Sequence, residues 1–442
     1  MTSTAITRRA LLAAGLAAAG SGSARAQAIL QVNDVDVAIV GGGAAGIAAA
    51  RRIVAAGRTC LLIEAAAKLG GRARTESPFG MPFDLGAAQM AEEDNPLVAA
   101  AKADGRDLVD LPASRRLYVD GREARDSAYD AFAVALGRAR RAIAATADAG
   151  RDVAAARALP DLGAWGATVE ATLGPLGCGR TLANVSAVDF ARRETPPGAV
   201  GSPQGMGALL EQLGAGLNQR IGTRVSRIDV STRGVTLEAG GTVRARVVIV
   251  ALPAAVLAAG AIRFGAGLPA RLQAAFPRLP SGLMERVGFL LPGNPLVLQP
   301  NETVLARASA APAAFLQARV GGTDLHVLTF GADVAASIAA NGETAGLKAA
   351  QDFIGQTFGT ANGARITKVV ASRWSTDPLV RGAMAVAAPG AGAVRRLFAE
   401  PAGRLIFAGE YTHETLWGTL AGAWSSGERA ADQALRMAGG PS

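Results

Sequence analysis

The stretch DVAIVGGGAAGIAAARR, residues 36–52, constrains the fold more than any other part of the chain. Its apolar run VAIV suits a strand that is buried on both faces. Gly41, Gly43 and Gly46 follow in the spacing G-x-G-x-x-G, and IAAARRIVAAG then reads as a helix that stops at its last glycine. Strand, glycine turn and helix form the context of a dinucleotide-binding fingerprint. The first glycine would allow the tight turn, the second the approach of a pyrophosphate, and the third close packing of helix on strand.

A second apolar stretch, TCLLIEA, supports this interpretation in a chain whose 55 glycines produce such spacings by chance. It ends in Glu64, at about the distance from the glycines where these folds place the acid that binds ribose hydroxyls. Alone, Glu64 would be read as a solvated acid at a strand end. Together with the glycine turn it predicts a bound dinucleotide.

The composition is that of a large globular protein. The chain has 442 residues, 50% of them hydrophobic and 18% charged, which allows two domains with sizeable cores. The net charge of +9 does not predict nucleic-acid binding, because no long basic run occurs and aromatic residues make up only 5%. Cys60, Cys178, His326 and His413 have no metal-ligand spacing, so we expect no metal site.

Residues 1–26 read as an export signal rather than as part of the fold. Arg8 and Arg9 precede a short apolar stretch, and Ala24-Arg25-Ala26 offers a small-residue cleavage site. This pattern predicts a twin-arginine signal peptide and a periplasmic location; an uncleaved tail or a misassigned start is the alternative. The apolar stretch is too short to span a bilayer, and we expect no integral membrane segment elsewhere.

Signals of a dinucleotide-binding domain occur in three separated blocks, with other sequence between them. The second block holds a strand that ends at VSRI, a hairpin and the strand of ARVVIVALP; the third holds the strand of GRLIFAGE and a helix from about Leu420 to Met437. The pattern predicts a mixed α/β chain in which a discontinuous Rossmann-like domain carries an inserted substrate-binding domain. The predicted cofactor domain comprises residues 34–110, 200–262 and 385–438, and the substrate domain residues 111–199 and 263–384.

These blocks resemble a known family, the flavin-containing amine oxidases, which include monoamine, polyamine and L-amino-acid oxidases and histone demethylases. VAIVGGGAAGIAAARRI, LLIEAAAKLGGRART and FDLGAAQM are similar to its N-terminal FAD segment, RARVVIVALPAAVL to its middle strand, and LIFAGEYTHETLWGTLAGAWSSGERAA to its C-terminal FAD segment. The resemblance implies FAD as the cofactor. The residues that it implies for binding FAD are Gly41, Gly43, Ala45, Gly46, Glu64, Ala65, Gly71, Arg72, Gly86, Ala87, Val225, Gly409, Glu410, Thr419 and Leu420.

The substrate side departs from the family. Many members have a lysine near the flavin's reactive nitrogen, where the strand SGLMERVGF here offers Arg286. Many also set two tyrosines in front of the flavin, at positions where this chain has Thr419 and either Leu379 or Met384. The segment DPLVRGAMAV lacks the cysteine that attaches the flavin in monoamine oxidases, so we expect non-covalent FAD.

Four residues are our candidates for work at the reacting centre: Arg286, Thr419, Trp417 and His413. Arg286 would place a fixed positive charge beside the flavin, unless it points to solvent from a strand edge. Trp417 would help to rebuild the pocket wall or would pack in the core. For His413 we expect a polar pocket role, because hydride transfer needs no strong base.

The resemblance implies an enzyme that oxidises the C–N bond of an amine or amino acid to an imine by hydride transfer to FAD. Two alternatives stay open. One is a related flavoenzyme that acts on C–C bonds, such as a carotenoid desaturase or a protoporphyrinogen oxidase. The other is a non-catalytic periplasmic FAD-binding or electron-carrier protein. As the electron acceptor we expect O2, a quinone or a cytochrome.

Overall fold

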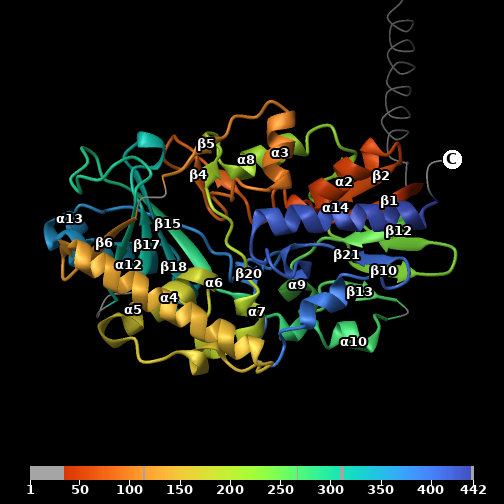
Figure 1. Cartoon of the computed structure of the whole chain (residues 1–442). Helices are drawn as coiled ribbons and strands as arrows, with labels where there is room; N and C mark the ends of the chain where they lie inside the picture. Colours follow the sequence, from red (N-terminus) through yellow and green to blue (C-terminus); the bar gives the residue numbers. More distant parts are fainter. Residues whose placement is uncertain (1–33, 113–114, 266, 309–312, 440–442) are drawn as a thin grey trace, which may run out of the picture.

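The computed structural model describes residues 34–112, 115–265, 267–308 and 313–439. In this part of the chain two large sheets lie toward opposite ends of the molecule, with helices packed around each (Figure 1). The predicted mixed α/β fold is confirmed. The predicted signal segment lies outside the described residues.

The first sheet gathers strands from the start, the middle and the end of the described chain. β1 lies between β2 and β12 and runs parallel to both, so that Val37 is level with Cys60 and with Val247. A strand between two neighbours and under helices is buried on both faces, which explains its unbroken apolar run. The strands, in spatial order, are β13 (Arg263–Phe264), β10 (Arg227–Val230), β11 (Val235–Glu238), β12 (Thr242–Val250), β1 (Asp34–Val40), β2 (Cys60–Ile63) and β9 (Gln219–Arg220), with β21 (Leu405–Phe407) paired in parallel to β12.

The strand that we predicted to end at Ile228 is placed differently. β10 begins at Arg227 and continues to Val230, and the chain turns only where Ser231 donates its N–H to the carbonyl oxygen of Gly234. Val225 therefore precedes the strand instead of lying inside it.

Two helices from opposite ends of the chain pack side by side on one face of this sheet. They are α2 (Ala44–Ala55) and α14 (Leu420–Met437), joined on that face by α3 (Pro96–Ala103) and α8 (Met206–Leu213) (Figure 1). The contact is so close that a side chain at Gly427 of α14 would overlap the carbonyl oxygen of Ala45 in α2. An ion pair from Arg52 Nε to Asp432 Oδ1, 2.6 Å long, joins the same two helices. The opposite face is covered by α9 (Ala254–Ala258) and α10 (Ala270–Gln273).

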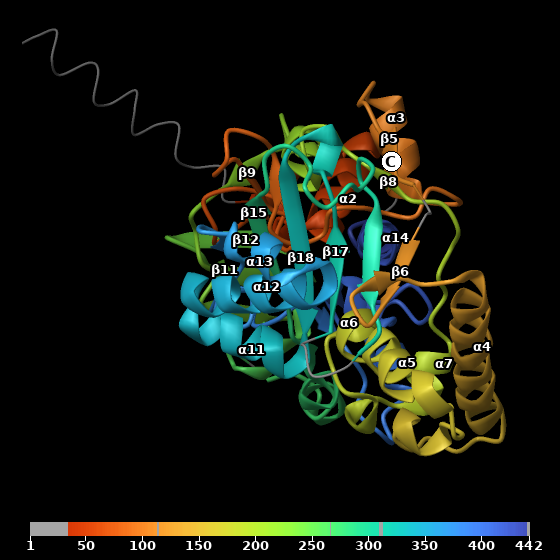
Figure 2. The ribbon, with the colours of Figure 1, turned by 90° about the vertical axis from the view of Figure 1, so that its left-hand side faces the viewer.

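The second sheet is mostly antiparallel, with one parallel pair between β16 and β6. Figure 2, in which this end of the molecule faces the viewer, shows α11 and α12 on one side of the sheet and α4, α5 and α7 on another. The strands, in spatial order, are β19 (Val370–Ala371), β15 (Met284–Leu290), β18 (Leu325–Gly331), β17 (Ala314–Gln317), β16 (Thr303–Ala306), β6 (Arg115–Val119) and β7 (Arg122–Glu123). The helices around it are α4 (Asp126–Asp148), α5 (Gly166–Leu173), α6 (Pro175–Cys178), α7 (Ala187–Ala191), α11 (Ala332–Asn341), α12 (Glu343–Phe358) and α13 (Thr360–Ala364).

Alternation along these strands separates two faces. Val287, Phe289, Leu328 and Phe330 point to one face and pack against apolar residues of α11 and α12. Their sequence neighbours point to the other face, toward the first sheet. Three short ladders complete the described sheets: β3 (Thr75–Glu76) with β4 (Phe83–Asp84), β5 (Val109–Asp110) with β8 (Val200–Gly201), and β14 (Ser281–Gly282) with β20 (Met384–Ala385).

A buried ion pair ties the helical insertion to the C-terminal part of the chain. Arg395 Nε lies 2.7 Å from Asp189 Oδ1 of α7, and both side chains are about 2% exposed. The same guanidinium donates to the carbonyl oxygens of Ala385 and Tyr411, so four of its five N–H groups are hydrogen-bonded. Among the described helices, no segment is both long and apolar enough to cross a membrane.

We predict that Gly427→Ala destabilises the protein by about 1–3 kcal/mol, because the new methyl group must push α14 away from α2. Gly355→Ala in α12 is the matched control, since its methyl group would meet only ordinary contacts. That variant should be neutral or gain roughly 0.5–1 kcal/mol from better helix propensity. Thermal melting of the purified variants checks both, and equal melting temperatures would contradict the close contact.

Candidate active site

A cavity of about 810 Å³ is lined by residues of both large sheets and of the loops between them. It brings together most of the residues singled out from the sequence, although they come from distant parts of the chain. Those that line it are Gly41, Gly43, Ala45, Glu64, Ala65, Gly71, Arg72, Gly86, Ala87, Val225, Arg286, Gly409, Glu410, Thr419 and Leu420. Gly46, His413 and Trp417 do not line it.

One end of the cavity is formed by the glycine turn and the N-terminus of α2. The N-cap residue is Gly43, no side chain caps the helix, and its first turn carries no acid. A Cβ at Gly43 would have no protein atom nearer than 3.9 Å, so this glycine keeps its face toward the cavity open. Uncapped N–H groups and the positive end of the helix dipole make this turn an anion site.

Gly46 has a different task in the same turn. A side chain there would overlap the carbonyl oxygen of Gly41, so the residue allows the helix to lie directly against the strand end. Gly46 thus allows close packing of the helix on the strand and does not contact a group bound in the cavity.

Glu64 follows β2 and lies beside the glycine turn. Its carboxylate accepts hydrogen bonds from the N–H groups of Gly42 and Ala66, each 2.6 Å long. A carboxylate has about four acceptor positions, so these bonds orient it and leave others for hydroxyl groups.

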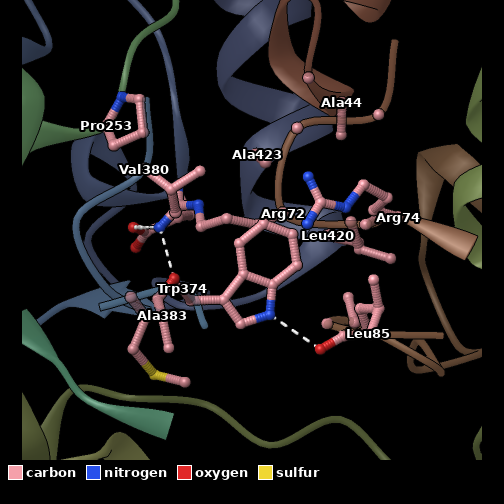
Figure 3. Close-up of a pocket in the computed structure, with 18 of the residues that line it drawn as sticks. Ala44, Arg72, Arg74, Leu85, Pro253, Trp374, Val380, Ala383, Leu420 and Ala423 are labelled. Atoms are coloured by element: carbon pink, nitrogen blue, oxygen red, sulfur yellow. Dashed lines mark hydrogen bonds and ion pairs between the residues drawn. The ribbon is translucent and has the colours of Figure 1, made fainter. Parts of the chain in front are cut away.

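A second helix N-terminus, that of α14, also lines the cavity. Thr419 is the N-cap: its hydroxyl accepts from the N–H of Gly422 at 3.0 Å and donates to the carbonyl oxygen of Leu416 at 2.6 Å. Thr419 lines the cavity. Leu420 and Ala423 of the same helix line it as well (Figure 3). The hydroxyl of Thr419 is therefore engaged in starting the helix, and the helix presents its positive end to the cavity.

Glu410 holds the segment that leads into this helix. It is 4% exposed and accepts from Arg72 Nη1 at 2.8 Å, from the N–H of Ala385 at 3.0 Å and from the N–H of Gly418 at 2.9 Å. Arg72 also donates to the carbonyl oxygen of Ala383 at 2.6 Å (Figure 3). These contacts fix the cavity wall, and the charges of Arg72 and Glu410 offset each other.

Trp374 forms another part of the wall. Its indole Nε1 donates to the carbonyl oxygen of Leu85 at 2.8 Å, and the guanidinium of Arg74 lies 4.9 Å from its ring centroid (Figure 3). The loop that carries Trp374 is held by the fully buried carboxylate of Glu285, which accepts from Ser372, Trp374 and Ser375. Arg74 lines the cavity too, and its Nε is buried without a hydrogen-bond partner.

Arg286 is turned into the cavity and not to solvent. It is 9% exposed, and it donates to the carbonyl oxygen of Gly86 at 3.0 Å and to Gln317 Oε1 at 3.2 Å. Its Nε is buried without a partner. Burial lowers the pKa of the guanidinium, and the carboxylate of Asp84 partly opposes this; no ion pair joins Arg286 to an acid in the described residues. Because arginine stays protonated, the site holds a positive charge that no ion pair neutralises among the described residues.

Two of the candidate residues, Trp417 and His413, lie outside the lining of the cavity. Trp417 is fully buried, donates to the carbonyl oxygen of Asp189 and is stacked between the guanidinium groups of Arg193 and Arg395. His413 accepts from the N–H groups of Thr415 and Leu416 through Nδ1, and burial lowers its pKa. Both side chains support the turn before α14, away from the cavity.

Residues of the second sheet also line the cavity, and the sequence analysis missed them. They are Arg115, Thr303, Phe315, Gln317 and Thr329, which the strand register brings into neighbouring positions with Arg286. The available signal was one polar residue on the cavity-facing side of each of four mostly apolar strands. That signal was weak because each strand alone resembles an ordinary half-exposed strand.

The cavity fits the cofactor that the sequence implies. It has two helix N-termini for the negatively charged parts of FAD, an open glycine turn, a carboxylate for ribose hydroxyls, and an unpartnered arginine N–H. Both cysteines are buried and neither lines the cavity. In the described residues, no group of three or more His, Cys, Asp or Glu side chains is arranged to hold a metal ion.

Comparison with known proteins agrees with this geometry. The family described as flavin containing amine oxidoreductase matches residues 44–435. Polyamine oxidase 2 of Arabidopsis thaliana is 26% identical over 91% of this chain and 88% of its own length. Cyclohexylamine oxidase from Brevibacterium oxydans superposes with a TM-score of 0.77 at 22% identity, covering 91% of this chain and 99% of that one. A putrescine oxidase bound to putrescine does so with the same score and coverage at 18% identity.

We predict that Gly43→Val yields a folded protein without flavin, because its side chain fills the open face of the turn while its Cβ meets the protein only at ordinary van der Waals distances. Gly46→Val is the contrasting variant: it should fail to fold, since its side chain overlaps the carbonyl oxygen of Gly41. Flavin absorbance and circular dichroism of the purified variants distinguish the two. Full flavin content in Gly43→Val would refute the assignment of this turn.

Proposed function

Since the chain belongs to the flavin-containing amine oxidoreductase family, we propose that it oxidises the C–N bond of an amine or amino acid to an imine in the cavity described above. The observation that carries the proposal is the meeting of two helix N-termini with the wall of the second sheet in one cavity. A flavin bound there supplies the chemistry, since it accepts a hydride from the carbon next to the amine nitrogen.

The protein's own groups would bind FAD, orient the substrate and shield the reacting carbon from water. In our proposal the glycine turn and α2 hold the pyrophosphate of FAD, Glu64 holds a ribose, and the N-terminus of α14 faces the flavin ring. The other residues proposed to contact FAD are Ala45, Ala65, Gly71, Arg72, Gly86, Ala87, Val225, Gly409, Glu410, Thr419 and Leu420. The apolar side chains of Trp374, Leu379 and Met384 would exclude water from the reacting carbon.

Arg286 is the group that we propose to lie nearest to the reaction, where relatives have lysine. A fixed cation beside the flavin stabilises negative charge that builds up on reduction. The same cation repels a protonated amine, so the reacting amine would be bound in its neutral form.

We also propose the division into a cofactor domain and an inserted substrate domain at the boundaries given above.

The decisive experiment is anaerobic mixing of the purified holoprotein with amines, amino acids and polyenes. We expect amines or amino acids to bleach the flavin absorbance near its visible maximum, with imine hydrolysis releasing ammonia or a smaller amine. Bleaching by polyenes alone would show chemistry on C–C bonds instead. A flavin that none of these substrates reduces, although dithionite does, would favour the non-catalytic alternative.

We propose that FAD is held without a covalent bond, because both cysteines are buried away from the cavity. Acid precipitation of the holoprotein is then expected to release all flavin into the supernatant. A yellow pellet that keeps its colour through washing would indicate a covalent link.

We further propose export to the periplasm by the twin-arginine route, which carries folded proteins and so suits an enzyme that acquires its cofactor beforehand. The support is the sequence pattern of residues 1–26 alone. In the periplasm the electron acceptor would be O2, a quinone or a cytochrome.

The double change Arg8→Lys, Arg9→Lys preserves the charge and removes the arginine pair, and it should hold the precursor in the cytoplasm. Cell fractionation followed by immunoblotting measures this. The matched control is Arg25→Lys, which leaves the pair intact and should be exported. Normal export of the double variant would disprove the route.

A further inference from the structure

The wall of the cavity formed by the second sheet has a marked charge pattern. Five neighbouring strands each contribute a polar side chain to the face that looks into the cavity: Arg286 from β15, Thr329 from β18, Gln317 from β17, Thr303 from β16 and Arg115 from β6. The register makes this a continuous band, since Arg286 is opposite Thr329, and Thr303 is level with both Gln317 and Arg115. A cation stands at each end of the band.

Within the described residues, no acid pairs with the guanidinium of Arg115. Its guanidinium lies 4.9 Å from the ring centroid of Phe315, which also lines the cavity, and it makes no ion pair there. Phe315 is level with Thr329, which faces Arg286 on the next strand. The cation of Arg115 therefore leans along the sheet toward Arg286.

The described acids that line the cavity lie outside this band and are already engaged. Glu64 accepts from main-chain N–H groups, Glu410 pairs with Arg72, and Glu76 and Asp377 lie within 4 Å of Arg74. Asp84, whose carboxylate acts electrostatically on Arg286, does not line the cavity. It accepts hydrogen bonds from the hydroxyl of Thr75 and from the N–H of Met206. The band thus offers two cations, two hydroxyls and an amide with no carboxylate among them.

We propose that the substrate carries a carboxylate, and that Arg115 binds it together with the Gln317 end of the band. This rests on the proposed function and narrows it: the cavity would take an aminocarboxylate in preference to a diamine or polyamine. A distal ammonium group would meet two like charges on this wall, whereas a carboxylate would form charge-assisted hydrogen bonds. The apolar lining by Leu176, Met284, Phe315 and Met384 would receive a hydrophobic side chain.

Binding to the unmodified holoprotein tests the inference without turnover. The probes are 3-phenylpropanoate and α,α-dimethyl-3-phenylpropylamine, which carry opposite terminal charges, titrated by calorimetry or by perturbation of the flavin spectrum. The α-carbon of this amine bears no hydrogen, so it cannot deliver a hydride to the flavin. We expect the carboxylate to bind at least tenfold more tightly. Equal or tighter binding of the amine would overturn the inference.

Substitutions at Arg115 and at a control position test whether the carboxylate binds at this band. Arg115→Gln should weaken binding of 3-phenylpropanoate about tenfold or more, and Arg115→Lys should recover part of it. Arg122→Gln, which removes an exposed charge from the neighbouring strand β7, is the control and should not change binding. Equal weakening in Arg115→Gln and Arg122→Gln would assign the preference to net charge and overturn the role of the band. Melting temperature and flavin content show whether each variant is folded.

Flavin reduction separates this inference from the proposed function. Matched pairs of an amino acid and its decarboxylated amine serve as substrates: phenylalanine with phenethylamine, and ornithine with putrescine. Faster reduction by the amino acid of a pair supports both proposals. Reduction by the amines alone upholds amine oxidation and overturns the carboxylate preference, while reduction by no member of either pair counts against the proposed function itself.

Discussion

The packing of α14 directly on α2 is the contact on which the rest of the site depends. Only a glycine at position 427 lets the two helices approach until α14 meets the carbonyl oxygen of Ala45. This approach brings both helix N-termini to one cavity, although they belong to opposite ends of the chain. Two positive helix ends at one place are unfavourable unless negative charge lies between them. The geometry of the helices thus creates the need for an anionic cofactor that the cavity is shaped to hold.

A single strand connects the two halves of the site. Adjacent residues of β15 point in opposite directions, as in any strand. The side chain of Arg286 therefore enters the cavity, while that of Glu285 faces away from it. The carboxylate of Glu285 accepts hydrogen bonds from the loop that carries Trp374. The position of the indole and the position of the guanidinium are consequently linked through one backbone. A shift of β15 would therefore move the cavity wall that contains Trp374 together with the wall that contains Arg286.

Local patterns were enough to predict the fold and the end of the cavity near the glycine turn. The apolar run of β1, the glycine spacing and the helix from Leu420 to Met437 are set by residues close in sequence. The position of Trp417 depends instead on α7, Arg193 and Arg395, which no short-range pattern reveals. Arg115 was missed for the same reason, because its use follows from the order of five strands that are far apart in the chain.

The joining of the chain's two ends also determines when the site can exist. Arg52 and its partner Asp432 are separated by 380 positions, and β1 lacks its second neighbour in the sheet until β12 has been synthesised. At ordinary rates of synthesis the N-terminal segment would remain without its last helix for a time on the order of tens of seconds. During that interval the face of α2 that packs against α14 has no partner, and the cavity lacks the N-terminus of α14. The complete cavity therefore exists only once the segment that forms α14 has been added.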